Sequence, residues 1–363
     1  MHALTTTPAG KTRARGAGVP FPGEPGRCNA ITDVAGVLVG YTTLIVGEDV
    51  RTGVTAVLPR PHAAMATPVF AGFHSLNGNG ELTGTLWVEE AGRLAGPITI
   101  TNTHSCGTVR DASIKWLVAN GGGIDAFALP VAGETYDGYL NDINGFHVRD
   151  EHAFSAIEQA VGGAIEEGSV GGGTGMICYG YKGGSGTASR KIAFADATYH
   201  VGAFVQANFG RREQLTIAGV PVGRTLSVAA DDAERGSIIA VLATDAPFMP
   251  HQLKRLARRV GLGIGRGGAV SGHGSGDIFL AFSTANAIAH HDEERLAEMR
   301  FVPNNHIDRF FDGVIQAVDE AVMNALFANQ TMTGRNGHIV DALPHDAVLA
   351  QLRAHGVVLE SAG

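Results

Sequence analysis

A glycine–serine pair stands where a polar segment meets an apolar run. Segment 225–236 (TLSVAADDAERG) carries paired acidic residues, whereas 238–244 (IIAVLAT) is continuously apolar, with Gly236 and Ser237 at the boundary. Glycine permits strained backbone conformations, so a Ser237 hydroxyl that attacked the Gly236 carbonyl would give an ester. Hydrolysis would free a serine α-amine, whose ordinary pKa of about 7.7–8.0 suits it as the base for its own hydroxyl. The junction would suit a self-cleaving hydrolase, but Gly-Ser before a strand is more commonly a simple turn, so the junction alone leaves both interpretations open.

Other patterns that could carry chemistry are weaker. The glycines of 171–175 are not followed by Gly-Lys-Ser/Thr, and GLGIGRGG (261–268) follows a predicted helix, whereas a dinucleotide fingerprint follows a strand. A G-x-S-x-G elbow is absent from the sequence, which argues against an α/β-hydrolase. We therefore expect no nucleotide and no other cofactor.

Histidine and cysteine show no recognised catalytic or ligand spacing. The sequence has 15 histidines but no HExxH, and the spacing of His74, His104, His273 and His290-His291 is not that of a metal site. Cys106 stands at a predicted helix start, which can lower a thiol pKa, but it lacks an evident histidine partner. We expect no metal, and a buried structural role for Cys106.

The elements that must position Ser237 follow from hydrophobic patterning. The run 238–244 predicts a strand buried on both faces, and further strands are predicted over Val34–Thr42, Val54–Leu58, Ile98–Asn102 and Asp277–Ser283. Helices are predicted over Cys106–Asn120, Glu151–Glu167 (with Phe154, Ile157 and Val161 on one face), His251–Val260 and Arg309–Gln330. The glycine-rich 171–186 must be loop or closely packed strand. This pattern indicates a layered α/β architecture and leaves open whether it has one sheet or two.

Composition indicates a globular enzyme. Of 363 residues, 44% are hydrophobic and 17% charged, and the net charge of −8 gives no reason to expect nucleic acid or an anionic membrane as partner. Three distant cysteines make a disulfide framework improbable. Residues 1–26 are basic without an apolar core, so we expect a flexible arm rather than a secretory signal, with the fold beginning near Arg27. No apolar stretch approaches a bilayer span of about 20 residues, and we expect a cytoplasmic protein.

From Arg27 onward the sequence resembles the P1 (S58) peptidase family, which includes DmpA-like L-aminopeptidase/D-esterases and β-peptidyl aminopeptidases. The matching stretches are collinear and span roughly nine-tenths of the chain: 27–43, 77–98, 134–148, 171–190, 206–210, 235–259, 271–286 and 324–346. Among them are NGNGELTG, ETYDGYLND, GYKGGSGTASR, QANFG, RGSIIAVLATDAPFMP and SGHGSGDIFLAF. The length and order of the match make it specific.

The resemblance implies a fold and a maturation. The fold would be a four-layer αββα sandwich of the DmpA/ornithine-acetyltransferase type, similar to N-terminal nucleophile hydrolases but differently connected. A precursor with one peptidase domain, 27–363, would cut itself into an α chain, 1–236, and a β chain, 237–363, which stay associated. Assemblies in the family are commonly tetramers of αβ units.

The resemblance also assigns catalytic roles at matching positions. Ser237 matches the nucleophile, and Ser275 and Asp277, in GSGD, match a hydroxyl and a carboxylate near it, with glutamate replacing the aspartate in some members. Ser275 would orient the Ser237 amine or relay its proton, and Asp277 would favour the ammonium form. Asn208 matches an oxyanion-hole residue whose amide is worth about 3 kcal/mol. An ordinary turn at Asn208 or a strand cap at Asp277 would be the structural alternatives.

Two more residues belong to the substrate side of this assignment. Tyr136, in ETYDG, would supply a phenolic donor to the oxyanion site, and Glu134 would hold the ammonium of the substrate. Both also fit ordinary loop positions.

The predicted function is an N-terminal-serine aminopeptidase that releases N-terminal residues from short peptides, amides or esters, with β-peptides as further candidates. One alternative is an endo-amidase on oligoamides such as nylon oligomers, although related self-cleaving enzymes of that type use threonine. A second is a non-catalytic scaffold, which would remain a single uncut chain.

Overall fold

The computed structural model describes residues 2–120, 128–226, 236–286 and 296–360, and its core contains two sheets. The six-stranded sheet has the order β4 (Arg93–Leu94), β3 (Val69–Gly78), β12 (Gly276–Ser283), β11 (Ser237–Thr244), β10 (Ala197–Asn208), β9 (Gly184–Phe194). The four-stranded sheet has the order β1 (Leu38–Val46), β2 (Val50–Leu58), β5 (Ile98–Asn102), β6 (Val131–Thr135). Two small hairpins join β7 (Ile177–Cys178) to β8 (Tyr181–Lys182) and β13 (Met332–Thr333) to β14 (Ile339–Val340).

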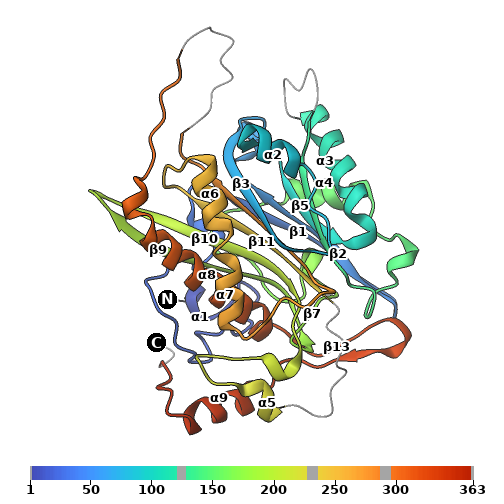
Figure 1. Cartoon of the computed structure of the whole chain (residues 1–363). Coiled ribbons are helices and arrows are strands. Elements are labelled where there is room, and N and C mark those ends of the chain that lie inside the picture. The colour runs from blue at the N-terminus through green and yellow to red at the C-terminus, as the bar shows by residue number, and fades with distance from the viewer. Residues whose placement is uncertain (1, 121–127, 227–235, 287–295, 361–363) are drawn as a thin grey trace.

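Helices cover the outer face of each sheet (Figure 1). Helices α6 (Pro250–Ala257), α7 (Val260–Arg266) and α8 (Asp308–Phe327) lie over the six-stranded sheet, whereas α3 (Cys106–Asn120) and α4 (Asp150–Glu158) lie over the four-stranded one. The shorter helices are α1 (His2–Thr5), α2 (Thr85–Ala91), α5 (Val222–Leu226) and α9 (His345–Ala354). The expected αββα sandwich is confirmed.

Strand β11 is covered by apolar side chains on both faces of its sheet. Its alternate side chains Ile238 and Leu242 belong to the core under α8, and Ile239 and Val241 belong to the core between the sheets. Successive strand residues point to opposite faces, so a continuous apolar run suits a strand that is covered on both. The strand predicted from 238–244 is confirmed, and every residue of β11 is buried.

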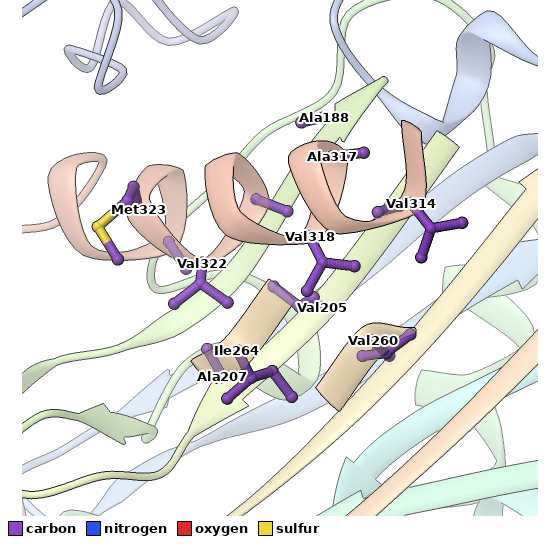
Figure 2. Packing of buried hydrophobic residues seen from close by; sticks show 14 of the residues in the cluster. Ala188, Val205, Ala207, Val260, Ile264, Val314, Ala317, Val318, Val322 and Met323 are labelled. Atoms are coloured by element: carbon purple, nitrogen blue, oxygen red, sulfur yellow. The ribbon is translucent and has the colours of Figure 1, made fainter. Parts of the chain in front are cut away.

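Helix α8 supplies the outer core of the six-stranded sheet. Figure 2 shows Val314, Val318 and Val322 along one face of this helix, with Val205 and Ala207 of β10 beneath them. These three valines follow one another at i, i+4 spacing, which is typical of the apolar face of a helix, and all three are buried. The glycine-rich segment 171–186 is closely packed, as expected: a Cβ on Gly186 would overlap the Ala321 carbonyl of α8.

Two predictions about local structure are corrected. Helix α4 ends at Glu158 instead of Glu167, because Val161 pairs with Val39 of β1 and Gly163 takes φ +84°. The N-terminal segment is packed against the rest of the protein, so the folded part begins before Arg27. Val19 is fully buried, and Arg13 forms a buried ion pair with Glu167 at 2.7 Å.

The smaller boundaries differ by a few residues. Strand β1 lies at Leu38–Val46 rather than Val34–Thr42, while β5 and α3 coincide with their predictions. Most of the predicted linker 225–236 lies outside the described residues. Within the described ranges, no helix combines the length and the apolar character that a membrane crossing requires.

Candidate active site

Ser237 is the first residue of β11 and lies between the ends of two other strands. Its register partners are Asn208, the last residue of β10, and Gly276, the first of β12. The Gly276 N–H donates to Ser237 Oγ at 3.1 Å. Ser237 has the same strand parity as Ile239 and Val241, so its side chain faces the space between the sheets. Three strands therefore fix the hydroxyl at the end of the inter-sheet core.

Gly236 fits where a larger residue would not. A Cβ built on Gly236 would overlap the carbonyl oxygen of Asn208 and crowd the Cα of Phe209. The end of β10 thus presses directly against the peptide that precedes Ser237. This close approach explains the glycine at position 236.

The Asn208 side chain is buried and oriented by two hydrogen bonds. Its Oδ1 accepts from the N–H of Ile177 at 2.7 Å, and its Nδ2 donates to the carbonyl of Tyr136 at 2.9 Å. An amide nitrogen carries two hydrogens, so the second can serve an oxygen that gains negative charge beside Ser237. The side chain is only 1% exposed, in keeping with a preorganised donor.

Ser275 and Asp277 flank Gly276 and contact each other. The Ser275 hydroxyl donates to Asp277 Oδ1 at 2.7 Å, and both side chains are buried. The donor that reaches Ser237 Oγ is the intervening Gly276 N–H. The structure therefore places the Ser275–Asp277 pair beside the start of β11, with the serine hydroxyl turned toward the aspartate.

A pocket of about 570 Å³ opens next to Ser237. It brings together four predicted site residues, Gly236, Ser237, Glu134 and Tyr136, whereas Asn208, Ser275 and Asp277 are buried and are not among its lining residues. Its remaining lining residues, which we did not predict, are Asn79, Gly80, Glu81, Thr103 and Gly274. Residues 77–80 repeat Asn-Gly, which is a turn signal, and this signal could have indicated Asn79, Gly80 and Glu81.

Glu134 and Tyr136 differ sharply in exposure. Glu134 is 2% exposed and accepts from the Glu81 N–H at 2.9 Å, whereas Tyr136 is 44% exposed. Burial raises the pKa of Glu134 above its ordinary value, although hydrogen bonds from Thr103 and the Glu81 N–H oppose the shift. With the carboxyl of Glu81 also on the pocket wall, this end of the pocket suits a cation.

Cys106 has the structural role that its sequence context indicated. It is 1% exposed, its thiol contacts the carbonyl of Ala132, and burial together with the charges of Glu81 and Glu134 raises its pKa to about 12. A thiol in this state is not a nucleophile at neutral pH.

The histidines near the pocket lie at the surface. His104 is exposed and stacks on Phe146, and His273 is exposed. Among the residues that the structure describes, no three histidine, cysteine or acidic side chains are grouped as metal ligands.

Comparisons with known proteins show similarity along most of the chain. The family model for peptidase family S58 matches residues 29–340. The β-peptidyl aminopeptidase BapA of Sphingosinicella microcystinivorans is 51% identical over 94% of this chain and 91% of its own length. The BapA of Sphingosinicella xenopeptidilytica is 43% identical over 97% and 93%.

A solved structure extends the similarity to the fold. The L-aminopeptidase D-Ala-esterase/amidase of Ochrobactrum anthropi, described as a prototype for the serine aminopeptidases and a new variant of the Ntn hydrolase fold, superposes with a TM-score of 0.91. It is 45% identical, and the match covers 95% of this chain and 99% of that one.

Proposed function

This chain belongs to peptidase family S58 and is a serine aminopeptidase, and we propose that it makes its own nucleophile by cutting itself between Gly236 and Ser237. The observation that carries the proposal is the position of Ser237: it is the first residue of a rigid buried strand, it lines the pocket, and its Oγ accepts from Gly276.

The self-cleavage is an N-to-O acyl shift followed by hydrolysis. Ser237 Oγ attacks the Gly236 carbonyl carbon, the C–N bond breaks, and the serine nitrogen gains the hydroxyl proton. Water then hydrolyses the ester, which leaves a carboxylate on Gly236 and a free amine and hydroxyl on Ser237. Gly236 suits this step because the crowded end of β10 restricts the scissile peptide.

Peptide hydrolysis would reuse the same atoms. The Ser237 amine accepts the proton of its own hydroxyl as Oγ attacks the substrate carbonyl, and the departing amine takes that proton. The Asn208 amide donates to the oxyanion, and Tyr136 supplies a phenolic donor from the pocket wall. Ser275 and Asp277 together favour the transient ammonium on Ser237. A second water releases the acyl group and restores the hydroxyl.

Glu134 would select substrates with a free N-terminal ammonium. A buried carboxylate in the pocket recognises that cation and leaves the scissile carbonyl near Ser237. This arrangement favours release of N-terminal residues over endo-cleavage of oligoamides. We propose short peptides, amides and esters as substrates, with β-aminoacyl residues included because the two BapA relatives are named β-peptidyl aminopeptidases.

The products of self-cleavage, residues 1–236 and 237–363, would remain one folded unit. Strand β11 is paired along its length with β10 of the first product and β12 of the second, so the cut leaves the sheet intact. From the family resemblance, we further propose tetramers of such αβ units and a cytoplasmic location.

Ser237→Ala tests the proposal. Intact-mass analysis of the wild-type protein should show two chains, the second beginning Ser-Ile-Ile-Ala, and the variant should show one chain without hydrolysis of aminoacyl or β-aminoacyl p-nitroanilides. Ser283→Ala removes a buried serine from the far end of β12 and should still be processed. A cut or active Ser237→Ala protein would refute the mechanism.

A further inference from the structure

One peptide group links a buried lysine to the proposed oxyanion donor. The carbonyl of Met176 accepts from Lys182 Nζ at 2.7 Å and from the Gly183 N–H at 2.9 Å. The N–H at the other end of the same peptide, that of Ile177, donates to Asn208 Oδ1 at 2.7 Å. Because the peptide unit is planar, whatever fixes the carbonyl also fixes the direction of this N–H.

The peptide belongs to a hairpin that is docked on the end of β10. Strands β7 and β8 are joined through Tyr179 and Gly180, which have φ of +51° and +67°, and positive φ at both central residues is the signature of a tight type I′ turn. The Tyr179 N–H donates to the Phe209 carbonyl at 2.7 Å, and the two rings pack edge to face at 5.2 Å. The hairpin is thereby anchored immediately after Asn208.

Lys182 has an unusual environment for a lysine. Its side chain is fully buried, and two backbone carbonyls, those of Met176 and Gly183, accept from its Nζ. Burying an ammonium is costly, and here burial lowers the pKa of Lys182 to about 7. The amine can donate to both carbonyls whether charged or neutral, since even the neutral form keeps two hydrogens. An apolar side chain of the same volume would avoid the desolvation cost but would remove this donor from both carbonyls.

We propose that Lys182 is a positioning residue for the aminopeptidase reaction. It holds and polarises the Met176–Ile177 peptide, which in turn keeps the Asn208 amide turned with its oxygen toward Ile177 and its nitrogen toward the developing oxyanion. Hydrogen bonds in series strengthen one another, so a donor on the carbonyl makes the Ile177 N–H a better donor to Asn208. The proposal rests on the role assigned above to Asn208.

Lys182→Met, which keeps the volume and removes the donors, tests this role. Loss of the whole Asn208 amide is expected to lower kcat by about 10²–10³, and partial misorientation of the amide should lower it by about tenfold, with KM within twofold of wild type. We measure kcat per processed chain, counted by mass spectrometry, so that incomplete self-cleavage does not mimic slow turnover.

A double-mutant cycle separates positioning from general stabilisation. In an Asn208→Ala background, Lys182→Met should change kcat by less than twofold, because the group it positions is gone. Equal losses in both backgrounds, or an unchanged kcat in the single variant, would overturn the proposal. If Asn208→Ala alone leaves kcat unchanged, the assignment of Asn208 fails instead, and the two failures are distinct.

Two further variants guard the interpretation. Asn329→Ala removes donors to the carbonyls of Lys182 and Gly183 on the other strand of the hairpin, and it should lower Tm while leaving kcat within twofold. Lys182→Gln retains N–H donors at shorter reach, should recover part of the kcat, and replaces Lys182→Met in the cycle if the methionine variant does not fold. A glutamine variant that lost the same factor in both backgrounds would also contradict the proposal.

Discussion

Two buried polar regions of this molecule are built in opposite ways. Where the N-terminal segment meets α8 and β9, the buried side chains are paired ions, with Glu320 between Arg15 and Arg190. At the ends of β10, β11 and β12, backbone groups hold Asn208 and Ser237 Oγ, and the carboxylate of Asp277 accepts from the neutral Ser275 hydroxyl. We call the first the ionic region and the second, after its uncharged donors, the neutral region. The named side chains of both regions are buried, and the regions differ in which groups are left to serve a ligand.

The charged groups of the ionic region are paired with one another. Glu320 is fully buried and lies 2.7 Å from a guanidinium nitrogen of each arginine, with the Asn29 amide as a further donor. Burial alone would raise the pKa of Glu320, but the charges of Arg190 and Arg15 outweigh it and lower the pKa below its ordinary value. Such a cluster pins the N-terminal segment and offers no group to a substrate.

The neutral region keeps a donor in reserve. Asn208 uses its oxygen and one of its two amide hydrogens within the protein. A fixed cation at this place would hold an anion permanently, whereas a preorganised neutral donor stabilises a charge that exists only in the transition state. In the proposed mechanism, buried polar groups serve stability where charges are paired, and Asn208 serves catalysis as a neutral donor with one hydrogen left over.

The largest effect is expected on the free energy of unfolding, from a variant that breaks the ionic region. Glu320→Ala leaves Arg190 buried without its partner carboxylate, and breaking a buried pair costs about 3–5 kcal/mol of unfolding free energy. Urea unfolding should show this loss, while kcat per processed, folded chain should stay within twofold of wild type. Glu320→Gln, which keeps an acceptor oxygen, is the variant to use if the alanine protein does not fold.

The neighbouring residue on α8 provides the control. Asp319→Ala removes an ion pair to Arg266, whose side chain is 50% exposed, and it should cost less than about 1 kcal/mol.

The pH dependence of stability gives a second test of Glu320. Because the pKa of Glu320 is lowered in the folded protein, its contribution to the unfolding free energy is present above its ordinary pKa and is lost as the pH falls through its pKa in the folded protein. An equal cost for both variants, or no extra acid sensitivity of wild type over Glu320→Gln, would contradict this account.

The next largest effect is expected on kcat, from a variant that removes the spare donor of the neutral region. Asn208→Ala should lower kcat by about 10²–10³ through loss of the oxyanion donor, with KM changed much less. Steady-state kinetics on an aminoacyl p-nitroanilide measure both quantities, after mass spectrometry has confirmed the Ser237 terminus.

Gln206, two residues earlier on the same strand face, is the matched control. It is fully buried and donates to the Thr101 carbonyl and the Thr135 hydroxyl. Gln206→Ala should lower stability by about 1–3 kcal/mol through unsatisfied buried groups and leave kcat within threefold. If Gln206→Ala slowed turnover as much as Asn208→Ala, the contrast between structural and catalytic polar groups would not hold.

The sequence predicted the elements whose signals are local. Strand β11 and helix α3 were found because a continuous apolar run and a terminal glycine run mark them. The prediction of a helix as far as Glu167 was wrong because Val161, which was counted with Phe154 and Ile157 on its apolar face, pairs with Val39 of β1 instead.

The misses among polar residues have a long-range cause. Arg13 lies 154 residues from Glu167, its ion-pair partner, so no local pattern shows that the N-terminal segment is packed. Loop residues such as Asn79 and Glu81 reach the pocket only because β3 lies beside β12 in the sheet. The roles of Ser237 and Asn208 were predicted through the family resemblance, and their assignment stays a prediction until the variants are measured.

The smallest expected effect concerns Glu134, a buried carboxylate that keeps an open side toward the pocket and so combines features of both regions. Glu134→Gln should raise KM for aminoacyl substrates by about tenfold, which corresponds to about 1.4 kcal/mol of binding free energy, because the ammonium loses its countercharge. The turnover number kcat should stay within a few-fold. Glu81→Gln, which alters the exposed carboxylate on the same pocket wall, should change KM by less than threefold.

The pH dependence of KM sharpens the assignment of Glu134. The carboxylate is the form that binds the ammonium, and burial raises its pKa above the ordinary value of 4.5. As the pH falls, wild-type KM should therefore begin to rise at a higher pH than an ordinary glutamate would give, whereas Glu134→Gln should show no such rise. An ester substrate that lacks the amino group isolates the effect, since its KM should not depend on Glu134 at any pH. A Glu134→Gln enzyme with wild-type KM and an unchanged pH profile would place the ammonium elsewhere, and it would return Glu134 to the structural class that Glu320 represents.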